Sequence, residues 1–198
     1  SFMGGFSMMT ATATILMMLF IGGNIIRRFG WGAGALITPV VLLITGVGFF
    51  SFVIFRESLT GFIAMFGTSP LMLAVAFGTI QNFMSKSSKY SLFDPTKEMA
   101  YIPLDQESKV KGKAAIDVVG ARLGKSGGSL IQQGLIVWLG SLAAITPYIA
   151  AILFFIIFAW LWAAKSLSGQ FVKLNAEKEA EKAAKAEAKV KELEREVA

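Results

Sequence analysis

Three ionisable residues, Asp117, Arg122 and Lys125, lie inside the stretch at residues 113–133, KAAIDVVGARLGKSGGSLIQQ, which otherwise reads as a membrane-spanning helix. An ionisable group at bilayer depth costs roughly a few kcal/mol, so such groups are rarely retained without a polar path or a charged ligand. A helix rises about 1.5 Å per residue, which carries Lys125 about 18 Å inward from Lys113, close to the middle of a hydrocarbon layer about 30 Å thick. We therefore expect the functional site to be centred on these three charges.

The charges in this stretch do not balance, because Asp117 cannot neutralise both Arg122 and Lys125. The alternative is a packed bundle in which Asp117 simply pairs with one cation, but that leaves a positive charge that calls for an anion from elsewhere. At about 100° per residue, the small and polar side chains share one face of the helix, as expected for the lining of an aqueous cavity. The expected cavity-lining residues are Asp117, Gly128, Ser129 and Gln132.

The composition indicates a membrane protein without enzyme chemistry. The 198 residues are 55% hydrophobic, with a mean hydropathy of +0.63 and with neither cysteine nor histidine. Thiol, disulfide and imidazole chemistry are therefore excluded, and we expect no catalytic residue, no metal and no cofactor. The run GARLGKS is not the phosphate loop of a nucleotide hydrolase, because Val119 stands where that motif needs glycine and no strand precedes it. The chain starts without methionine, and we expect it to be a piece of a longer polypeptide.

Five apolar runs are long enough to cross a membrane as helices, which predicts an all-α membrane protein with five transmembrane helices. These runs cover residues 2–26, 31–55, 59–84, 114–142 and 147–164. Pro39, Pro70 and many glycines lie inside them, as is usual where transmembrane helices bend or pack closely. We expect a helix kink near Pro70, and we assign residues 1–167 to the transmembrane region.

The loop charges are strongly asymmetric, which predicts the orientation in the membrane. Sixteen Lys and Arg residues fall on one side of the five predicted helices, whereas Arg56 is alone on the other side. By the positive-inside rule, the loop at residues 85–113 and the C-terminus lie on the cytoplasmic or stromal side. The net charge of +6 follows from this arrangement, so we expect the lipid bilayer as a partner and no nucleic acid.

Residues 168–198 form a polar C-terminal tail. From residue 175 onward the sequence is NAEKEAEKAAKAEAKVKELEREVA, a composition that predicts a soluble helix with ion pairs between residues one turn apart. Val190, Leu193 and Val197 form a short apolar seam, which offers a partner-binding role as the alternative. Three apolar residues are too few for a coiled coil, so a plain exposed helix is the favoured interpretation.

The loop and the stretch after it carry a family resemblance. Residues 89–105, KYSLFDPTKEMAYIPLD, are followed by KGKAAIDVV at 111–119, LGKSGG at 123–128 and AAKSL at 163–167. These segments closely resemble the non-mitochondrial ATP/ADP translocases of plastids and of obligate intracellular bacteria. The resemblance covers most of residues 80–170, whereas the earlier runs match that family mainly in hydropathy.

The resemblance implies a twelve-helix fold similar to the major facilitator transporters, in which the five helices here are the last five. It implies antiport of ATP and ADP, in some members with phosphate, by a transporter that is not an enzyme. Lys125 in LGKSGG matches a nucleotide-binding position of the family, and Arg122 joins it as a phosphate-binding residue on the charge argument alone. The expected location is the plastid inner envelope or another plastid membrane, with the inner membrane of an obligate intracellular bacterium as second choice.

Alternatives remain open for both the loop and the function. We expect residues 89–105 to be a rigid strap stiffened by Pro95 and Pro103 rather than a gate, with Lys97 and Glu98 as ion-pair residues at the membrane surface. A relative that carries another nucleotide, or that imports nucleotides with protons, is one alternative function. Another is a truncated or split family member that serves as a membrane-embedded structural subunit. The expected partners are therefore ATP, ADP, and the remainder of the transporter or a larger membrane assembly.

Overall fold

The computed structural model describes residues 2–16, 20 and 23–197, which contain α-helices and two longer π-helical segments but no β-strand. The elements are α1 (Phe2–Leu16), α2 (Gly23–Ile54), α3 (Arg56–Ala64), α4 (Pro70–Ser88), the π-helical η2 (Lys89–Phe93), α5 (Asp94–Ala100), α6 (Gln106–Lys113), the π-helical η3 (Ala114–Gly120), α7 (Ala121–Leu139) and α8 (Leu142–Val197). The all-α prediction is confirmed for the described part of the chain.

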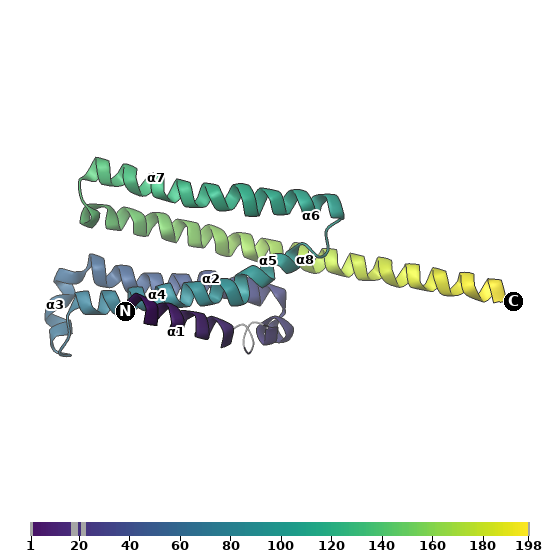
Figure 1. The fold of residues 1–198 in the computed structure, drawn as a ribbon, viewed down its shortest axis with the longest axis horizontal. Helices are drawn as coiled ribbons and strands as arrows, with labels where there is room; N and C mark the ends of the chain where they lie inside the picture. The colour runs from purple at the N-terminus through teal and green to yellow at the C-terminus, as the bar shows by residue number, and fades with distance from the viewer. Residues whose placement is uncertain (1, 17–19, 21–22, 198) are drawn as a thin grey trace.

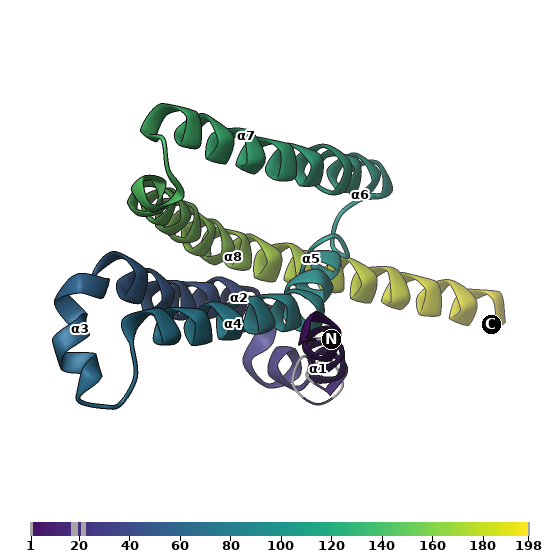
Figure 2. The same cartoon turned by 60° about the vertical axis from the view of Figure 1, so that its left-hand side comes forward.

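The long helices run alternately in opposite directions along one axis (Figures 1 and 2). The start of α2, the short helix α5, the start of α6 and the extended part of α8 lie toward one end. The helix α3 and the turn between α7 and α8 lie at the other end. The lysine-rich segments are therefore together, and the helix that carries Arg56 is opposite them, which agrees with the predicted alternation of the loops.

The third predicted run contains two helices instead of one kinked helix. Helix α3 ends at Ala64, Gly67 adopts a positive φ of 69°, and α4 begins at Pro70. Ser69 is extended, and its hydroxyl accepts the backbone N–H of Met72 at 3.2 Å, as serine does when it caps a helix start. Proline fits the first turn because the N–H that it lacks has no partner there in any helix. The predicted kink near Pro70 is therefore wrong, because the chain ends one helix and begins another.

A second break lies inside α2, at Gly30. Its φ of 83° and ψ of 172° belong to a region that residues with a Cβ rarely adopt, so this position favours glycine. The helical segment at 23–29 carries Arg27 and Arg28, and the apolar helix continues after the break from Trp31. The second predicted run, residues 31–55, therefore matches this helix closely at both ends.

Two helices of the described chain are long and apolar enough to cross a membrane, namely α2 and the Leu142–Lys191 part of α8. The predicted count of five is not confirmed by this criterion. Helix α1 has 15 residues, and part of the first predicted run lies outside the described residues. The third run is broken before Pro70, and α7 contains Arg122 and Lys125, which lower its hydropathy. The five-span arrangement stays a prediction.

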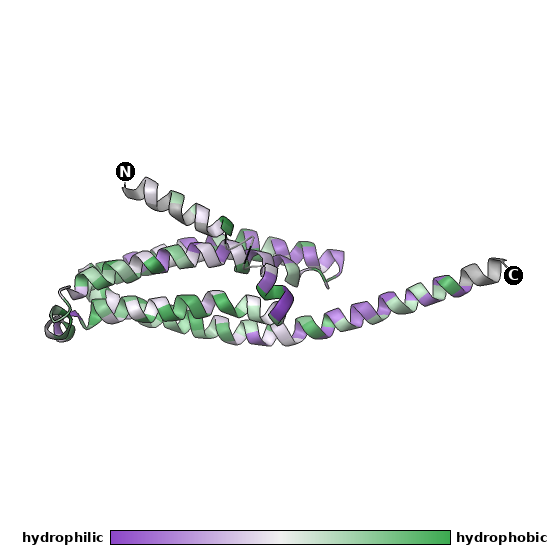
Figure 3. Ribbon diagram, turned by 90° about the horizontal axis from the view of Figure 1, so that it is seen from below, coloured by the Kyte–Doolittle hydropathy of each residue, from purple (hydrophilic) through white to green (hydrophobic). Residues whose placement is uncertain are grey.

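The helices pack most extensively where α2 meets α4 and α8. Glycine permits a close approach of α2 and α4, because a Cβ on Gly48 would lie 2.4 Å from ring atoms of Phe77. Toward the lysine-rich end, the buried rings of Trp31 and Phe171 stack with their centroids 4.8 Å apart, which joins α2 to α8. Hydrophobic, green residues are frequent along the closely packed long helices, whereas hydrophilic and hydrophobic residues alternate along the distal part of α8 (Figure 3).

Helix α8 continues without interruption from its apolar segment into the polar tail (Figure 3). The predicted ion pairs between residues one turn apart are confirmed there. They join Lys173 to Glu177, Lys182 to Glu179, and Lys185 to Glu181. In the apolar seam Val190 is exposed, while the side chains of Leu193 and Val197 lie outside the described residues.

The first turns of the tail are part of the packed body. Phe171 belongs to the buried cluster, although it lies past residue 167, where we expect the transmembrane region to end. Farther along, the Lys178 ammonium donates to the backbone carbonyls of Ile102 at 3.1 Å and Leu104 at 3.4 Å. These contacts attach α8 to the turn that follows α5. The domain boundary after residue 167 stays a prediction.

Candidate functional site

The predicted site residues lie on one continuous helical unit, residues 106–139, which consists of α6, η3 and α7. It begins after Asp105, whose carboxylate accepts the backbone N–H of Ser108 at 2.9 Å. This hydrogen bond lowers the pKa of Asp105. The unit ends at Gly140, which has a φ of 79° and closes the last turn through its N–H to the carbonyl of Ile136.

The π-helical segment η3 changes the register between Asp117 and the residues after it. A π-helix pairs residues five apart instead of four, so a spacing of 100° per residue does not hold through Ala114–Gly120. Arg122, Lys125 and Gln132 all follow this segment and lie on the regular helix α7. The predicted polar face is therefore regular along α7, whereas the angular position assigned to Asp117 from ideal helix geometry is wrong.

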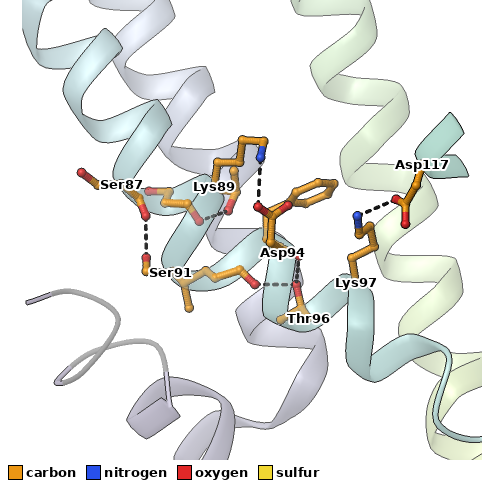
Figure 4. A network of polar contacts seen from close by, with 11 residues as sticks. Ser87, Lys89, Ser91, Asp94, Thr96, Lys97 and Asp117 are labelled. Atoms are coloured by element: carbon orange, nitrogen blue, oxygen red, sulfur yellow. Dashed lines mark hydrogen bonds and ion pairs between the residues drawn. The ribbon is translucent and has the colours of Figure 1, made fainter. Parts of the chain in front are cut away.

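Asp117 forms an ion pair with Lys97 of α5, with the lysine Nζ 2.7 Å from the carboxylate Oδ1 (Figure 4). The two side chains are 23% and 38% exposed, so water reaches the pair. The hydrogen bond to Asp117 is the main reason that the pKa of Lys97 is raised. The alternative in which Asp117 neutralises Arg122 or Lys125 is not the arrangement in this structure.

A second ion pair lies beside the first. The ammonium of Lys113 is 2.6 Å from a carboxylate oxygen of Glu98 and 5.7 Å from the centroid of the Tyr101 ring. The hydrogen bond to Glu98 raises the pKa of Lys113. Lys97 and Glu98 are thus ion-pair residues, as predicted, and together they attach α5 to the start of the 106–139 unit.

The loop at residues 89–105 is mostly helical, with η2 and α5 followed by a turn. Lys89 pairs with Asp94 at 2.9 Å, and the buried hydroxyl of Ser91 donates to the carbonyl of Ser87 (Figure 4). The hydroxyl of Thr96 donates to the carbonyl of Leu92 at 2.7 Å. These local bonds give the segment its own rigidity, which favours the strap over the gate.

The cations of α7 have a different environment. Arg122 and Lys125 are exposed, and neither has a hydrogen bond or an ion pair to the residues that the structure describes. Gly128, Ser129 and Gln132 are exposed on the same helix, which packs against α8 and has no buried residue of its own. The structure therefore keeps Arg122 and Lys125 on one helix and directs Asp117 away from them, toward α5.

Sequence reasoning did not identify Lys97 as the partner of Asp117. The only indication in the sequence was the group of charged residues within 89–105, from which we predict that Lys97 and Glu98 form ion pairs at the membrane surface. The pairing itself depends on how the turn at 101–105 folds α5 back against η3, which loop composition does not encode.

An all-helical chain with membrane-length apolar helices and cations inside a helix of the bundle is typical of membrane transport proteins. Comparison with known families agrees with this class. Residues 1–171 match the model of the TLC ATP/ADP transporter family, and the chain belongs to that family.

Curated relatives come from bacteria and from plants. The chain is 64% identical over 180 residues to ADP,ATP carrier protein 1 of Chlamydia pneumoniae, which covers 91% of this chain and 35% of the relative. It is 59% identical to the plastidic ATP/ADP-transporter of Solanum tuberosum, over 92% of this chain and 29% of the relative. It is 48% identical to ADP,ATP carrier protein 1 of Rickettsia typhi, over 86% of this chain and 34% of the relative.

The chain thus spans about a third of the length of these relatives. No solved structure matches it.

Proposed function

We propose that this chain is the C-terminal part of a transporter that exchanges ATP for ADP across a membrane. Membership of the TLC ATP/ADP transporter family and the names of the bacterial and plastid relatives support the substrate pair. The transport itself requires binding and release of the nucleotides but no bond cleavage, so no catalytic residue is needed.

The observation that carries this proposal is the unpaired positive charge on α7. Because Asp117 is paired with Lys97, both Arg122 and Lys125 need a counterion from outside the described residues. The phosphate groups of a nucleotide provide several anionic oxygens, and hydrogen bonds between ammonium or guanidinium groups and phosphate are among the strong ones in proteins. Lys125 and Arg122 are thus the proposed phosphate-binding residues, and Gly128, Ser129 and Gln132 line the cavity beside them.

The mechanism that suits this arrangement is alternating access. In the proposed twelve-helix protein, the five helical spans of this chain form most of one lobe, and the polar face of α7 looks toward the other lobe. Rocking of the two lobes about a fixed site near the middle of the membrane opens that site to each side in turn. The surface around Gly124, Gly127 and Gly128 is open, because a Cβ added at any of them would meet no atom within 4 Å, and this open space on α7 suits a bulky polyanion.

The orientation follows from the loop charges. The lysine-rich end of the bundle faces the cytoplasm or stroma, and the end with α3 faces the opposite compartment. A plastid envelope membrane is the proposed location, and the inner membrane of an intracellular bacterium is the second candidate, because both kinds of relative are similar to this chain.

The test compares Lys125→Gln with Lys109→Gln in the full-length polypeptide reconstituted in liposomes. Lys125→Gln removes a proposed phosphate ligand, whereas Lys109→Gln removes a lysine of the same charge from α6, outside the proposed cavity. A hydrogen bond to a charged group is worth about 1.5–3 kcal/mol, so Lys125→Gln is expected to weaken ADP binding by about tenfold to a hundredfold. Lys109→Gln is expected to leave binding and exchange near the wild-type level.

The outcome also separates the alternatives. Unchanged ADP binding in folded Lys125→Gln would show that Lys125 is structural. Weakened binding of another nucleotide, with no wild-type binding of ADP, would favour a relative with a different substrate. Exchange that appears only when further membrane proteins are reconstituted with this polypeptide would favour the structural-subunit alternative.

A further inference from the structure

The polar side chains of α7 change in kind along the helix. Its first turns carry the cations Arg122 and Lys125, and Ser129 follows one turn after Lys125. In the stretch LIQQGLIVWL at 130–139, the only side chains with a charge, a hydroxyl or an amide are those of Gln132 and Gln133. Two carboxamides thus lie in the apolar second half of the helix, beyond the proposed phosphate-binding residues.

Gln132 lies almost directly along the helix axis from Lys125. The two residues are seven positions apart on a regular α-helix, so their directions differ by about 20° and Gln132 is about 10 Å farther along the axis. Gln133 is turned by about 100° from Gln132. The centre of the predicted run at 114–142 lies between Lys125 and Gln132, so both are at the depth of the proposed site.

Neither carboxamide has a hydrogen bond to the residues that the structure describes, and both side chains are exposed. Helix α7 lies at the edge of the bundle beside α8 and has no buried residue (Figures 1 and 2). A glutamine amide has two N–H donors and an oxygen that accepts two hydrogen bonds. Leaving these groups unpaired inside a membrane costs free energy, so we expect a polar partner for them.

The parts that ATP and ADP share indicate what this partner is. The two nucleotides differ in the number of phosphates and have the same ribose and adenine base. In a nucleotide whose phosphates lie at Lys125, the ribose separates the base from them along the helix. Toward the start of the unit, Asp117 is already paired with Lys97, and its neighbour Val118 is apolar. Toward the end, Gln132 offers the unpaired donors and acceptor that a base needs.

A carboxamide matches adenine in particular. Its oxygen accepts from the N6 amino group while its N–H donates to N7, which is the pairing by which glutamine reads adenine in DNA. Guanine offers two acceptors, O6 and N7, at the same edge, so the amide oxygen would face an acceptor there.

We propose that Gln132 recognises the adenine base of the transported nucleotide through hydrogen bonds to N6 and N7, while Lys125 and Arg122 hold the phosphates. The inference rests on the proposed nucleotide exchange and adds the residue that selects the base. A base contact about two turns away from the cations accounts for the acceptance of both ATP and ADP, because it does not change with the number of phosphates.

The test measures equilibrium binding of three diphosphates to the full-length polypeptide by calorimetry. The probes are ADP, GDP and purine riboside diphosphate, in which hydrogen replaces the 6-amino group of adenine. One neutral hydrogen bond corresponds to between about a twofold and a tenfold difference in affinity, so the wild type is expected to prefer ADP over purine riboside diphosphate by this factor. Gln132→Leu is expected to bind these two probes equally. Gln133→Leu removes the neighbouring amide and is the matched control, which keeps the wild-type preference.

A second substitution changes what the position can donate and accept. A lysine ammonium has donors only, which match O6 and N7 of guanine but not the amino group of adenine. Gln132→Lys is therefore expected to prefer GDP over ADP, whereas the wild type is expected to prefer ADP. Comparing two diphosphates within one variant cancels the effect of the added charge on phosphate binding.

The proposal is overturned if folded Gln132→Leu keeps the preference for ADP, if Gln133→Leu loses it, or if Gln132→Lys still prefers ADP. It is also overturned if Gln132→Leu weakens all three probes by the same factor, because that result assigns Gln132 to the shared ribose or to packing against the rest of the polypeptide. Lys125→Gln is expected to weaken all three probes alike, so it tests the transport proposal separately. A wild type that binds none of the diphosphates would refute both proposals.

Discussion

The ion pair between Lys97 and Asp117 joins α5 to the helical unit that carries the proposed nucleotide site. We predict that it stabilises the folded protein by a measurable coupling energy without being essential for folding. The perturbations are Lys97→Met and Asp117→Asn, singly and together. Both replacements keep the approximate size of the side chain and remove its charge.

The size of the effect follows from the geometry. An exposed ion pair contributes about 0.2–1 kcal/mol, and a hydrogen bond to a charged group in a protected site contributes about 1.5–3 kcal/mol. The Nζ–Oδ1 distance of 2.7 Å is that of a good charge-assisted hydrogen bond, but the side chains are 23% and 38% exposed. Water screens such a pair, so we expect a coupling energy of about 1 kcal/mol, near the boundary of the two classes.

The assay is a double-mutant cycle on thermal unfolding of the detergent-solubilised full-length polypeptide. The control cycle uses Lys111 and Glu107, which are one turn apart on α6 and whose side chains are each 75% exposed. For that pair we expect about 0.3–0.5 kcal/mol. A coupling energy between Lys97 and Asp117 that is zero, or no larger than in the control, would refute the attachment of α5 to η3 through this contact.

The pH dependence gives a second check on the same pair. The pKa of Lys97 is raised in the folded state, so the folded state holds the proton more tightly than the unfolded chain does. The stabilisation is therefore complete below the ordinary lysine pKa of about 10.4 and is lost as the pH rises through the raised value. We expect the coupling energy to be constant from about pH 7 to 9 and to fall above about pH 10.4. A fall that begins below about pH 9 would contradict this assignment.

Four further predictions follow from particular contacts. Lys178→Met should speed amide hydrogen exchange in the 101–104 turn, because it removes two hydrogen bonds to that turn. Deletion of residues 179–198 should leave both the amide hydrogen exchange and nucleotide transport unchanged. Amide exchange in Lys178→Met at the wild-type rate would contradict the attachment of α8 to this turn through Lys178. The hydrogen bond that lowers the pKa of Asp105 is fully present above the ordinary aspartate pKa of about 3.9 and is lost as the pH falls through the lowered value. Amide exchange should therefore show that the first turn of α6 frays on acidification in the wild type. In Asp105→Ala the same turn should fray already at neutral pH. Gly48→Val should lower the thermal stability by about 1–3 kcal/mol because the new side chain meets Phe77, and an unchanged melting temperature would contradict the close approach of α2 and α4. Single cysteines at Lys109 and Thr146 should be labelled from opposite sides of sealed vesicles, and labelling from the same side would refute the alternating topology.

Sequence patterns predicted the apolar part of α2 but missed the break before Pro70 and the continuation of α8 beyond residue 167. The run at 31–55 matches the main part of α2 because its length and hydropathy are sufficient to identify it. The break before Pro70 depends on Ser69 taking an extended conformation and Gly67 a positive φ, which are backbone states that hydropathy does not encode. The long uninterrupted α8 was divided at residue 167 because composition changes there, although the helix itself does not.

For the candidate site, the sequence located the charges but not their partners. The positions of Arg122 and Lys125 on one helix follow from local periodicity, which α7 obeys. The partner of Asp117 depends on a π-helical segment and on a turn between α5 and α6, and both are set by tertiary packing. The number of charged residues in this helical unit does not depend on where each side chain lies around the helix. The excess of cations over Asp117 therefore holds in the structure, although the angular position expected for Asp117 does not.

The pairing of Asp117 divides the 106–139 unit into two parts with different roles. Its first part is held to α5 by Lys113 with Glu98 and by Asp117 with Lys97, so the charges there stabilise the structure. Its second part, α7, carries cations without a partner among the described residues, so the charges there are available to a ligand. The π-helical segment contains Asp117 and forms the end of the first part, and π-helical turns within helices occur frequently at functional sites. Substitutions in the two parts should therefore have different effects: those at the ion pairs change stability with little effect on nucleotide affinity, and those at Arg122 or Lys125 change affinity with little effect on stability.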